Sequence, residues 1–191
     1  MLVLILGLVL FLGVHSVRVF APAWRDRKRD ALGHGPWRGA YSLVSIIGFV
    51  LIVWGYGLAW AGAPVLYEPP VWLKHLAALL MLFAFMSIMV FALPAGRLKP
   101  ALKHPMLLAV KLWALAHLLA NGDLASLLLF GSFLAWAVLD RISVKRRGEA
   151  PPAPGPVFND ILALGVAAVL YLLFVWKLHL WLFGAVPIAT T

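Results

Sequence analysis

Six long apolar runs, separated by short polar segments, constrain this chain more than any other feature. In lipid, every backbone N–H and C=O must be satisfied internally, and a helix of roughly 20 apolar residues achieves this while crossing a bilayer. Hydrophobic residues make up 64% of the 191 residues, against about half in soluble domains. We therefore predict an all-α integral membrane bundle of six transmembrane helices, forming one domain over residues 1–191. The predicted spans are residues 2–20, 40–61, 71–93, 105–121, 124–139 and 157–183.

The basic residues predict how this bundle is oriented. Nearly all Lys and Arg residues outside the spans fall in the first, third and fifth connecting segments, and none fall in the second and fourth. Because basic loops stay in the cytoplasm, the odd segments are expected there and both termini on the opposite side. In the first segment, Gly33, Gly35 and Pro36 are expected to mark turns, and Asp140-Arg141 is expected to close the fifth span. Orientation therefore explains the net charge of +9 without a nucleic-acid partner.

Several kinds of chemistry are excluded by residues that the chain lacks. It contains no cysteine, which excludes disulfides, thiolate metal sites, iron–sulfur clusters, cysteine nucleophiles and covalent haem attachment through a pair of cysteines. The sequence also has no glycine-rich phosphate loop and no HExxH or GxSxG motif. Polar residues inside the apolar runs remain as candidates, because ionisable groups in lipid are costly and usually functional.

The stretch from Lys103 to Asp123, KHPMLLAVKLWALAHLLANGD, carries the most informative of these polar residues. Pro105 suits the first position of a helix, and the Asn-Gly pair suits its end. Lys111 and His117 interrupt the apolar helix, and His104 lies seven residues before Lys111 on the same face. Each has a structural alternative: Lys111 can extend to the nearer interface, His104 can be solvated, and His117 can be a hydrogen-bonded packing residue.

Histidines on different membrane helices suggest axial ligation of a b-type haem. Neutral imidazole binds iron through one ring nitrogen while a hydrogen-bond acceptor orients the other, and helix bundles hold cofactors between facing helices. Trp, Phe and Leu residues are abundant enough to supply an apolar wall. The predicted topology places three histidines toward the cytoplasmic side and three toward the outer side, namely His15, His34 and His104, then His75, His117 and His179.

Charged residues also gather in the inner half of the predicted bundle. Arg18, Lys111, Asp140 and Asp160 all fall there. An acid and a base inside one bundle usually pair. The alternatives are solvation of the two acids at the interface and, for Asp160, capping of its own helix, since acids suit a helix N-terminus.

Two stretches resemble the NnrU family, LGLVLFLGVHSVRVFAPAWRDRKRDALGHGPWRGAYSLVSIIGFVLIVWGYG and LKHPMLLAVKLWALAHLLANGDLASLLLFGSFLAWAVLDRISVKRR. The resemblance covers nearly the whole chain, from the first span to Arg147. It implies a bacterial inner-membrane protein associated with denitrification and nitric oxide metabolism. The family is similar to plant zeta-carotene isomerase, a membrane enzyme that uses haem b and has HS…R in an early span and HP…LAH…GN in a later one.

The similarity to the isomerase implies haem-binding positions in this chain. Its histidine positions match His15, His104 and His117. We predict His15 and His117 as axial ligands of the haem iron, His104 as the alternative partner, and Lys111 and Arg18 beside the cofactor; no catalytic residue is assigned. The isomerase has a further histidine in the fifth span, where this chain reads SFLAWAVLDR. The comparison therefore favours haem binding over carotenoid isomerisation.

Depth in the membrane tests this pair of ligands. His15 lies within about one turn of the inner boundary, and His117 lies 12 residues beyond Pro105. At 1.5 Å per residue their backbones differ in depth by roughly 8–13 Å, which requires a tilted haem or a longer first helix. A pair formed by His117 with His75 or His179 on the outer side is the third option.

These observations support two main hypotheses about function. The first is a haem-dependent membrane enzyme with a redox or isomerase-like role. The second is a non-enzymatic accessory protein for nitric oxide-reducing machinery, with electron-transfer membrane proteins as partners besides the lipid bilayer. A third hypothesis is weaker: the dipeptide His104-Pro105 resembles part of the RHPxY motif of isoprenylcysteine methyltransferases, which helps bind S-adenosylmethionine, but the Arg and the Tyr of that motif are missing.

Overall fold

The computed structural model describes residues 1–188, and its regular secondary structure is helical apart from one isolated bridge between Val65 and Asp123. The described chain divides into two compact units. Unit 1 comprises Met1–Tyr67 and Asp123–Arg146, and unit 2 comprises Glu68–Gly122 and the chain from Arg147 onward. The chain divides in this way, and the single domain over residues 1–191 stays a prediction. Residues 189–191 lie outside the described part of the chain.

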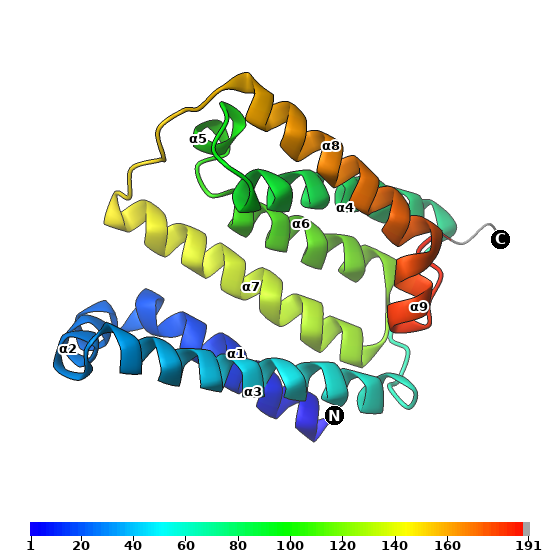
Figure 1. Cartoon of the computed structure of the whole chain (residues 1–191). Helices are drawn as coiled ribbons and strands as arrows, with labels where there is room; N and C mark the ends of the chain where they lie inside the picture. Colours follow the sequence, from blue (N-terminus) through cyan, green and yellow to red (C-terminus); the bar gives the residue numbers. More distant parts are fainter. Residues whose placement is uncertain (189–191) are drawn as a thin grey trace. The chain divides into compact units, whose positions relative to one another are not determined.

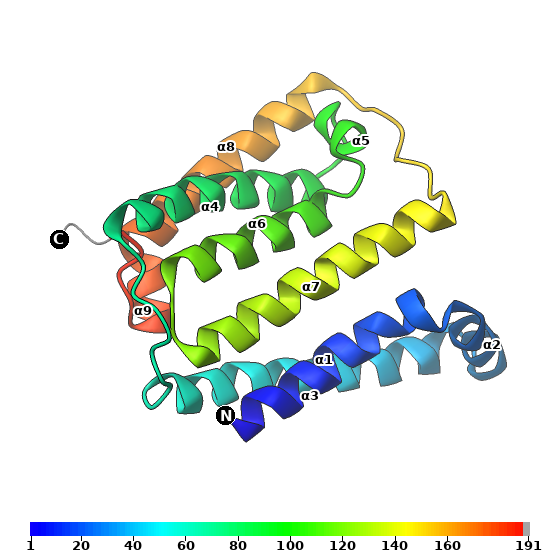
Figure 2. The same ribbon diagram turned by 180° about the vertical axis from the view of Figure 1, so that it is seen from behind.

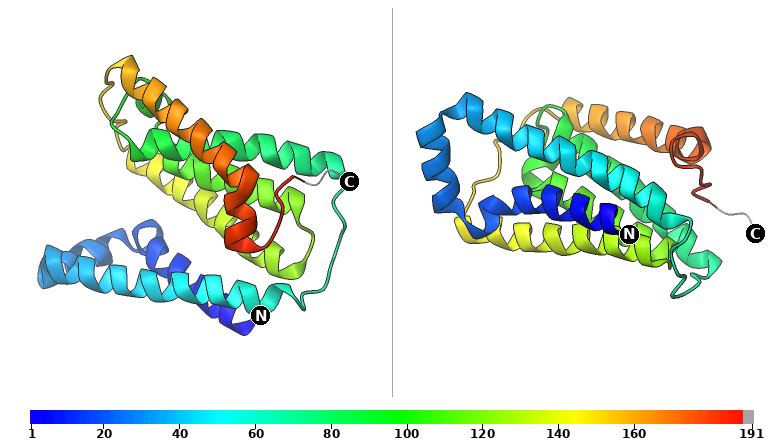
Figure 3. Two further views of the ribbon diagram at one scale, coloured as in Figure 1. Left: turned by 45° about the vertical axis from the view of Figure 1, so that its right-hand side comes forward. Right: turned by 90° about the horizontal axis from the view of Figure 1, so that it is seen from below.

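Unit 1 is built on an antiparallel pair of long helices, α1 and α3 (Figure 1). The short helix α2 links their ends, as Figure 3 shows. The fourth helix, α7, contributes the ring of Phe133, which lies 5.7 Å from the ring of Phe11 in α1. The helices run over Leu2–Phe20 (α1), Pro22–Leu32 (α2), His34–Trp60 (α3) and Leu124–Arg147 (α7).

Glycines bring α1 and α3 into close backbone contact. A Cβ atom placed on Gly48 of α3 would lie 2.7 Å from the backbone nitrogen of Phe11, and one on Gly7 of α1 would lie 2.6 Å from that of Ile52. Gly55 is equally crowded by the backbone of Leu4. Small residues let membrane helices approach this closely, so that van der Waals contact replaces the missing hydrophobic driving force.

A buried polar cluster fixes the start of α7 in unit 1. The Asp123 carboxylate accepts the backbone N–H of Ser126 at 2.9 Å and the Ser126 hydroxyl at 2.6 Å. The Tyr56 hydroxyl from α3 lies 2.9 Å from the same Ser126 oxygen. Asp123 thus satisfies an N–H group of the first turn, as capping residues do, and the cluster ties α7 to α3.

Unit 2 is arranged around α4, which contacts both α6 and α8 (Figure 2). The Tyr171 hydroxyl of α8 donates a hydrogen bond to the Ala78 carbonyl of α4 at 3.1 Å. The last apolar helix contains a π-helical segment, η1, before its final turn. The elements run over Val71–Ala92 (α4), Leu98–Leu102 (α5), Pro105–Ala120 (α6), Val157–Leu173 (α8), Phe174–Leu178 (η1) and His179–Phe183 (α9).

Asp160 holds the segment between α4 and α6 to the start of α8. It is 8% exposed, and its carboxylate accepts the N–H of Arg97 at 2.8 Å and of Leu98 at 3.0 Å, at the beginning of α5. The neighbouring Asn159 donates to the Ala95 carbonyl at 2.9 Å. The predicted solvation of Asp160 at the interface was therefore wrong, because the side chain is buried. Asp160 does lie in the first turn of its own helix α8, as the other alternative required, but its carboxylate binds the start of α5.

Five described helices are long and apolar enough to cross a membrane. They cover residues 2–20, 34–60, 71–92, 124–147 and 157–183. The remaining predicted span corresponds to α6, which is apolar but has 16 residues, about 24 Å at 1.5 Å per residue. The all-helical membrane class is therefore confirmed, whereas the sixth span stays a prediction.

Two predicted boundaries were wrong. Gly35 and Pro36 lie inside α3, because a proline in the first helical turn lacks only an N–H group that would have no intrahelical partner. The turn is made at Gly33, whose φ is 83°. Helix α7 continues past Asp140 to Arg147, since Lys and Arg favour helix, and it ends at Gly148 with a φ of 64°.

Candidate functional site

His15 lies in an aromatic cluster of unit 1 to which three helices contribute. Its ring stacks on Phe11 of α1 with centroids 4.3 Å apart. Tyr41 of α3 and Trp136 of α7 meet it edge-on, at 5.3 Å and 6.0 Å. The sequence predicted His15 as a candidate ligand, but the aromatic partners from α3 and α7 could not be identified from spacing along the chain.

In each of three histidines, a hydrogen bond to a different backbone carbonyl fixes the tautomer. The Nδ1 atom of His15 lies 2.6 Å from the Phe11 carbonyl oxygen, and that of His117 lies 2.8 Å from the Trp113 carbonyl oxygen. The Nδ1 atom of His179 lies 2.8 Å from the Ala185 carbonyl oxygen. Because a carbonyl can only accept, Nδ1 must carry the proton in each case, and the lone pair of the neutral ring is on Nε2.

The Trp136 indole beside His15 has an unusual property. Among the described residues, its Nε1 atom is the one buried side-chain nitrogen or oxygen without a hydrogen-bond partner. Buried donors are nearly always satisfied in proteins, and an exception calls for an explanation such as a bound group. The edge-on contact with His15 places this donor at the wall of the aromatic cluster.

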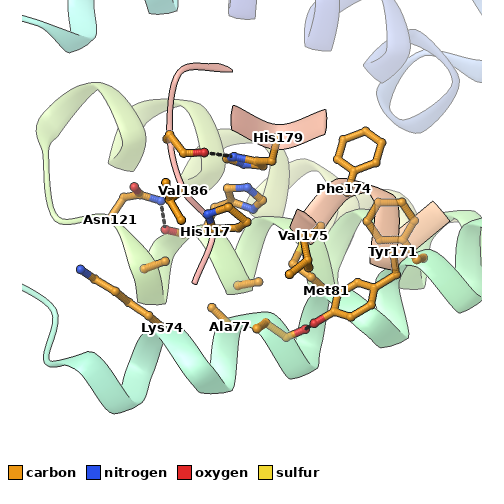
Figure 4. A pocket seen from close by; sticks show the side chains of 16 residues that line it. Lys74, Ala77, Met81, His117, Asn121, Tyr171, Phe174, Val175, His179 and Val186 are labelled. Atoms are coloured by element: carbon orange, nitrogen blue, oxygen red, sulfur yellow. Dashed lines mark hydrogen bonds between the residues drawn. The ribbon is translucent and has the colours of Figure 1, made fainter. Parts of the chain in front are cut away.

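Unit 2 contains a pocket of about 200 Å³ between α4, α6 and the last apolar helix. Figure 4 shows the rings of His117 and His179 together in it, with Lys74 and Asn121 to one side. On the other side lie apolar and aromatic side chains, which include Met81, Tyr171, Phe174 and Val175. The pocket therefore combines a polar end with an apolar body, as small-molecule sites do.

The two pocket histidines face each other closely. Their ring centroids are 6.5 Å apart, and their planes differ by 25°. His179 directly follows the π-helical segment η1, and Gly184, with a φ of 68°, turns the chain so that the Ala185 carbonyl can reach His179. Sequence reasoning named His179 only as a third option, because a π-helix and a turn of the following chain leave no simple periodic signal.

The predicted site residues are divided between the two units. His15 and Arg18 lie on α1 in unit 1, with Arg18 in the last turn of that helix. His104 caps the start of α6, and Lys111 and His117 lie within it, all in unit 2. The axial pair of His15 with His117 or His104 therefore stays a prediction.

The third option pairs His117 with His75 or His179 on the outer side. The structure describes this option more directly, because all three histidines lie in unit 2. His179 lines the same pocket as His117, whereas His75 is exposed and does not line it. Within residues 1–188, no three His, Asp or Glu side chains are grouped so that they could hold a metal ion by themselves. The pocket therefore offers two imidazoles and no acidic ligand.

Comparison with known proteins gives one match. A protein-family model described as NnrU protein matches residues 3–187, and so extends over both units. No curated protein and no solved structure matches the chain. The family resemblance predicted from the two quoted stretches is confirmed by this match.

Proposed function

The chain belongs to the NnrU family, and from this premise we propose that it is a multi-pass protein of the bacterial inner membrane that binds haem b and serves nitric oxide metabolism. One observation carries the haem proposal: His15 and His117 each donate Nδ1–H to the carbonyl four residues earlier, which leaves Nε2 as the nitrogen for iron. Such a bond is the usual means of orienting a ligating imidazole.

The chemistry of the donor set fits haem. His15 and His117 would be its axial ligands, with His104 as the alternative, and the cations Arg18 and Lys111 would suit the carboxylates of the cofactor. The unsatisfied Trp136 donor beside His15 is consistent with an acceptor that belongs there. The pocket of unit 2, at about 200 Å³, is smaller than the roughly 300–1,000 Å³ of typical ligand sites and would not hold the macrocycle by itself.

Haem b, when bound, would supply a redox-active iron whose potential is tuned by its axial ligands and their hydrogen bonds. The residues of this chain would hold the imidazoles in one tautomer and surround them with apolar side chains. We propose a redox or isomerase-like role on this basis. The second candidate is a non-enzymatic accessory protein that assists nitric oxide-reducing or electron-transfer membrane proteins.

A visible spectrum of the purified protein tests the haem proposal. Expression with ample haem should give a Soret band, and His15→Ala and His117→Ala should each change the coordination of the iron. His34→Ala is the matched control, because His34 is exposed at the start of α3. A wild-type protein without a haem band would remove this proposal and leave the accessory role.

The proposed orientation has a separate test. The basic segments should lie in the cytoplasm and both termini in the periplasm. Alkaline phosphatase fused after Thr191, outside the described residues, should then be active in a bacterial host. Strong activity from a fusion within residues 148–156 would instead reverse the topology.

A further inference from the structure

We propose that the unit 2 pocket binds a single hydroxylated aromatic ring of the hydroquinone type. The proposal rests on the pocket itself and not on the proposed haem. Size gives the first argument: an apolar cavity of about 150 Å³ holds benzene, so about 200 Å³ suits one ring with small substituents.

The walls of the pocket favour an aromatic ligand. The ring of Phe85 lies 6.0 Å from that of Tyr171 and 5.2 Å from that of Phe174, both in non-parallel arrangements. Aromatic groups prefer such edge-on and tilted neighbours, which add to the gain from burial. Met81 also lines the pocket, and a methionine sulfur interacts favourably with an aromatic ring. An aliphatic ligand would gain less from these walls.

The polar groups of the pocket select a hydroxyl group. His179 has its lone pair on Nε2 and can therefore accept a hydrogen bond from a ligand. Lys74 also lines the pocket and can only donate. A hydroxyl oxygen donates and accepts, whereas a carbonyl or carboxylate oxygen cannot donate. A hydroquinone therefore suits His179 better than a quinone or a carboxylate, and its oxygens are also suitable acceptors for Lys74.

Local backbone structure gives independent support. π-helices make up well under 1% of residues in proteins and occur frequently at functional sites. The segment η1 places Phe174 and Val175 on the pocket wall and is followed directly by His179. The pocket is lined in part by residues of α4 and α8, which belong to helices long and apolar enough to cross a membrane.

The test measures ligand binding to the purified protein in detergent. Binding is monitored by tryptophan fluorescence under argon. The probe is dimethylhydroquinone. His179→Leu should weaken its binding about tenfold, the usual effect of losing one hydrogen bond. His75→Leu, an exposed histidine of α4 that does not line the pocket, should leave binding unchanged. Val175→Trp, which fills the pocket without removing a polar group, should abolish binding.

Two related probes sharpen the result. Dimethylbenzoquinone has the same ring without hydroxyl donors, and dimethylbenzoate carries a charged acceptor; both should bind more weakly than the hydroquinone. The proposal is overturned if wild-type protein does not bind the hydroquinone, if His179→Leu binds it as well as wild type, or if the quinone or benzoate binds more tightly. Hydroquinone binding without a haem band would remove only the haem proposal, and a haem band without hydroquinone binding would remove only this one.

Discussion

Units 1 and 2 hold their membrane helices together in different ways. In unit 1, glycines at positions 7, 48 and 55 let the first half of α1 and the second half of α3 touch backbone to backbone. In unit 2, side chains bond to distant backbone groups: Asp160 binds the start of α5, and Tyr171 binds α4. Unit 2 also contains the pocket with two histidines, whereas His15 of unit 1 is packed among aromatic rings.

This difference links packing to function. Backbone contact through glycine leaves little free space between α1 and α3, so unit 1 is expected to tolerate no larger residue there. In unit 2, the pocket of about 200 Å³ lies where the C-terminal ends of α6 and α8 meet the first half of α4, whereas Asp160 makes its hydrogen bonds at the other end of α8. Substitutions that break the glycine contacts of unit 1 should therefore reduce the stability of the protein more than substitutions that break the hydrogen bonds of unit 2.

The largest effect is expected from Gly48→Leu. A Cβ atom there would lie 2.7 Å from the Phe11 nitrogen, and the crowding atom belongs to the backbone, which cannot rotate away. Overpacking of a core typically costs about 1–3 kcal/mol, and we expect the upper end or more. Gly57→Leu on the same helix is the control, since nothing lies within 4 Å of its added Cβ. Thermal unfolding in detergent measures both, and equal stability of the two variants would contradict close packing of α1 on α3.

Asp160→Ala should have the next largest effect. It leaves the part-buried N–H groups of Arg97 and Leu98 without their acceptor, and an unsatisfied donor costs about 1–3 kcal/mol when it is fully buried. We expect a net loss of about 2 kcal/mol in the free energy of unfolding, because water can reach part of the segment. Asp26→Ala removes an exposed ion pair with Arg25 and should change stability by less than about 0.5 kcal/mol. A loss no larger for Asp160→Ala than for Asp26→Ala would show that the hydrogen bonds from Asp160 to the start of α5 contribute little to stability.

The membrane class and the family could be predicted from sequence because both depend on local patterns. Long apolar runs identify helices directly. Three of the five candidate spans match the predicted ones within one residue, and the other two, 34–60 and 124–147, extend beyond the predicted 40–61 and 124–139. The remaining apolar run corresponds to α6, whose 16 residues are fewer than the roughly 20 that a bilayer requires. Its crossing of the membrane therefore stays a prediction.

The candidate site could be predicted only in part. His15 and His117 were found because they are polar residues in apolar helices and match a family pattern. Their partners come from elsewhere in the chain: Trp136 reaches His15 from α7, and His179 reaches His117 through η1 and a turn. Such contacts depend on tertiary packing, and neither hydrophobic periodicity nor loop charge carries information about them.

Ser126→Ala should have a moderate effect in unit 1. It removes the hydroxyl that links Asp123 to Tyr56 but keeps the Ser126 backbone N–H that Asp123 caps. We expect a loss of about 1 kcal/mol, the usual net value of a buried hydrogen bond. Tyr56→Phe removes the other end of the same link, and the double variant should lose less than the sum of the two single losses. Additive losses, measured by thermal unfolding, would mean that the two hydroxyls do not interact.

Trp136→Phe should have the smallest effect on stability. The variant tests whether the aromatic cluster around His15 serves only in packing or also binds a cofactor. In protein without haem, Nε1 has no partner, so removing it should offset the loss of ring volume and change the free energy of unfolding by less than about 1 kcal/mol. If a bound cofactor accepts a hydrogen bond from Nε1, the same variant should release haem several-fold faster in a competition with apomyoglobin. Trp54→Phe is the control, because Trp54 is 59% exposed on α3. A Trp136→Phe protein that retains haem like wild type would mean that the donor does not serve the cofactor. A large loss of stability without haem would mean instead that Trp136 is a packing residue, and that unit 1 relies on its aromatic cluster as much as on its glycines.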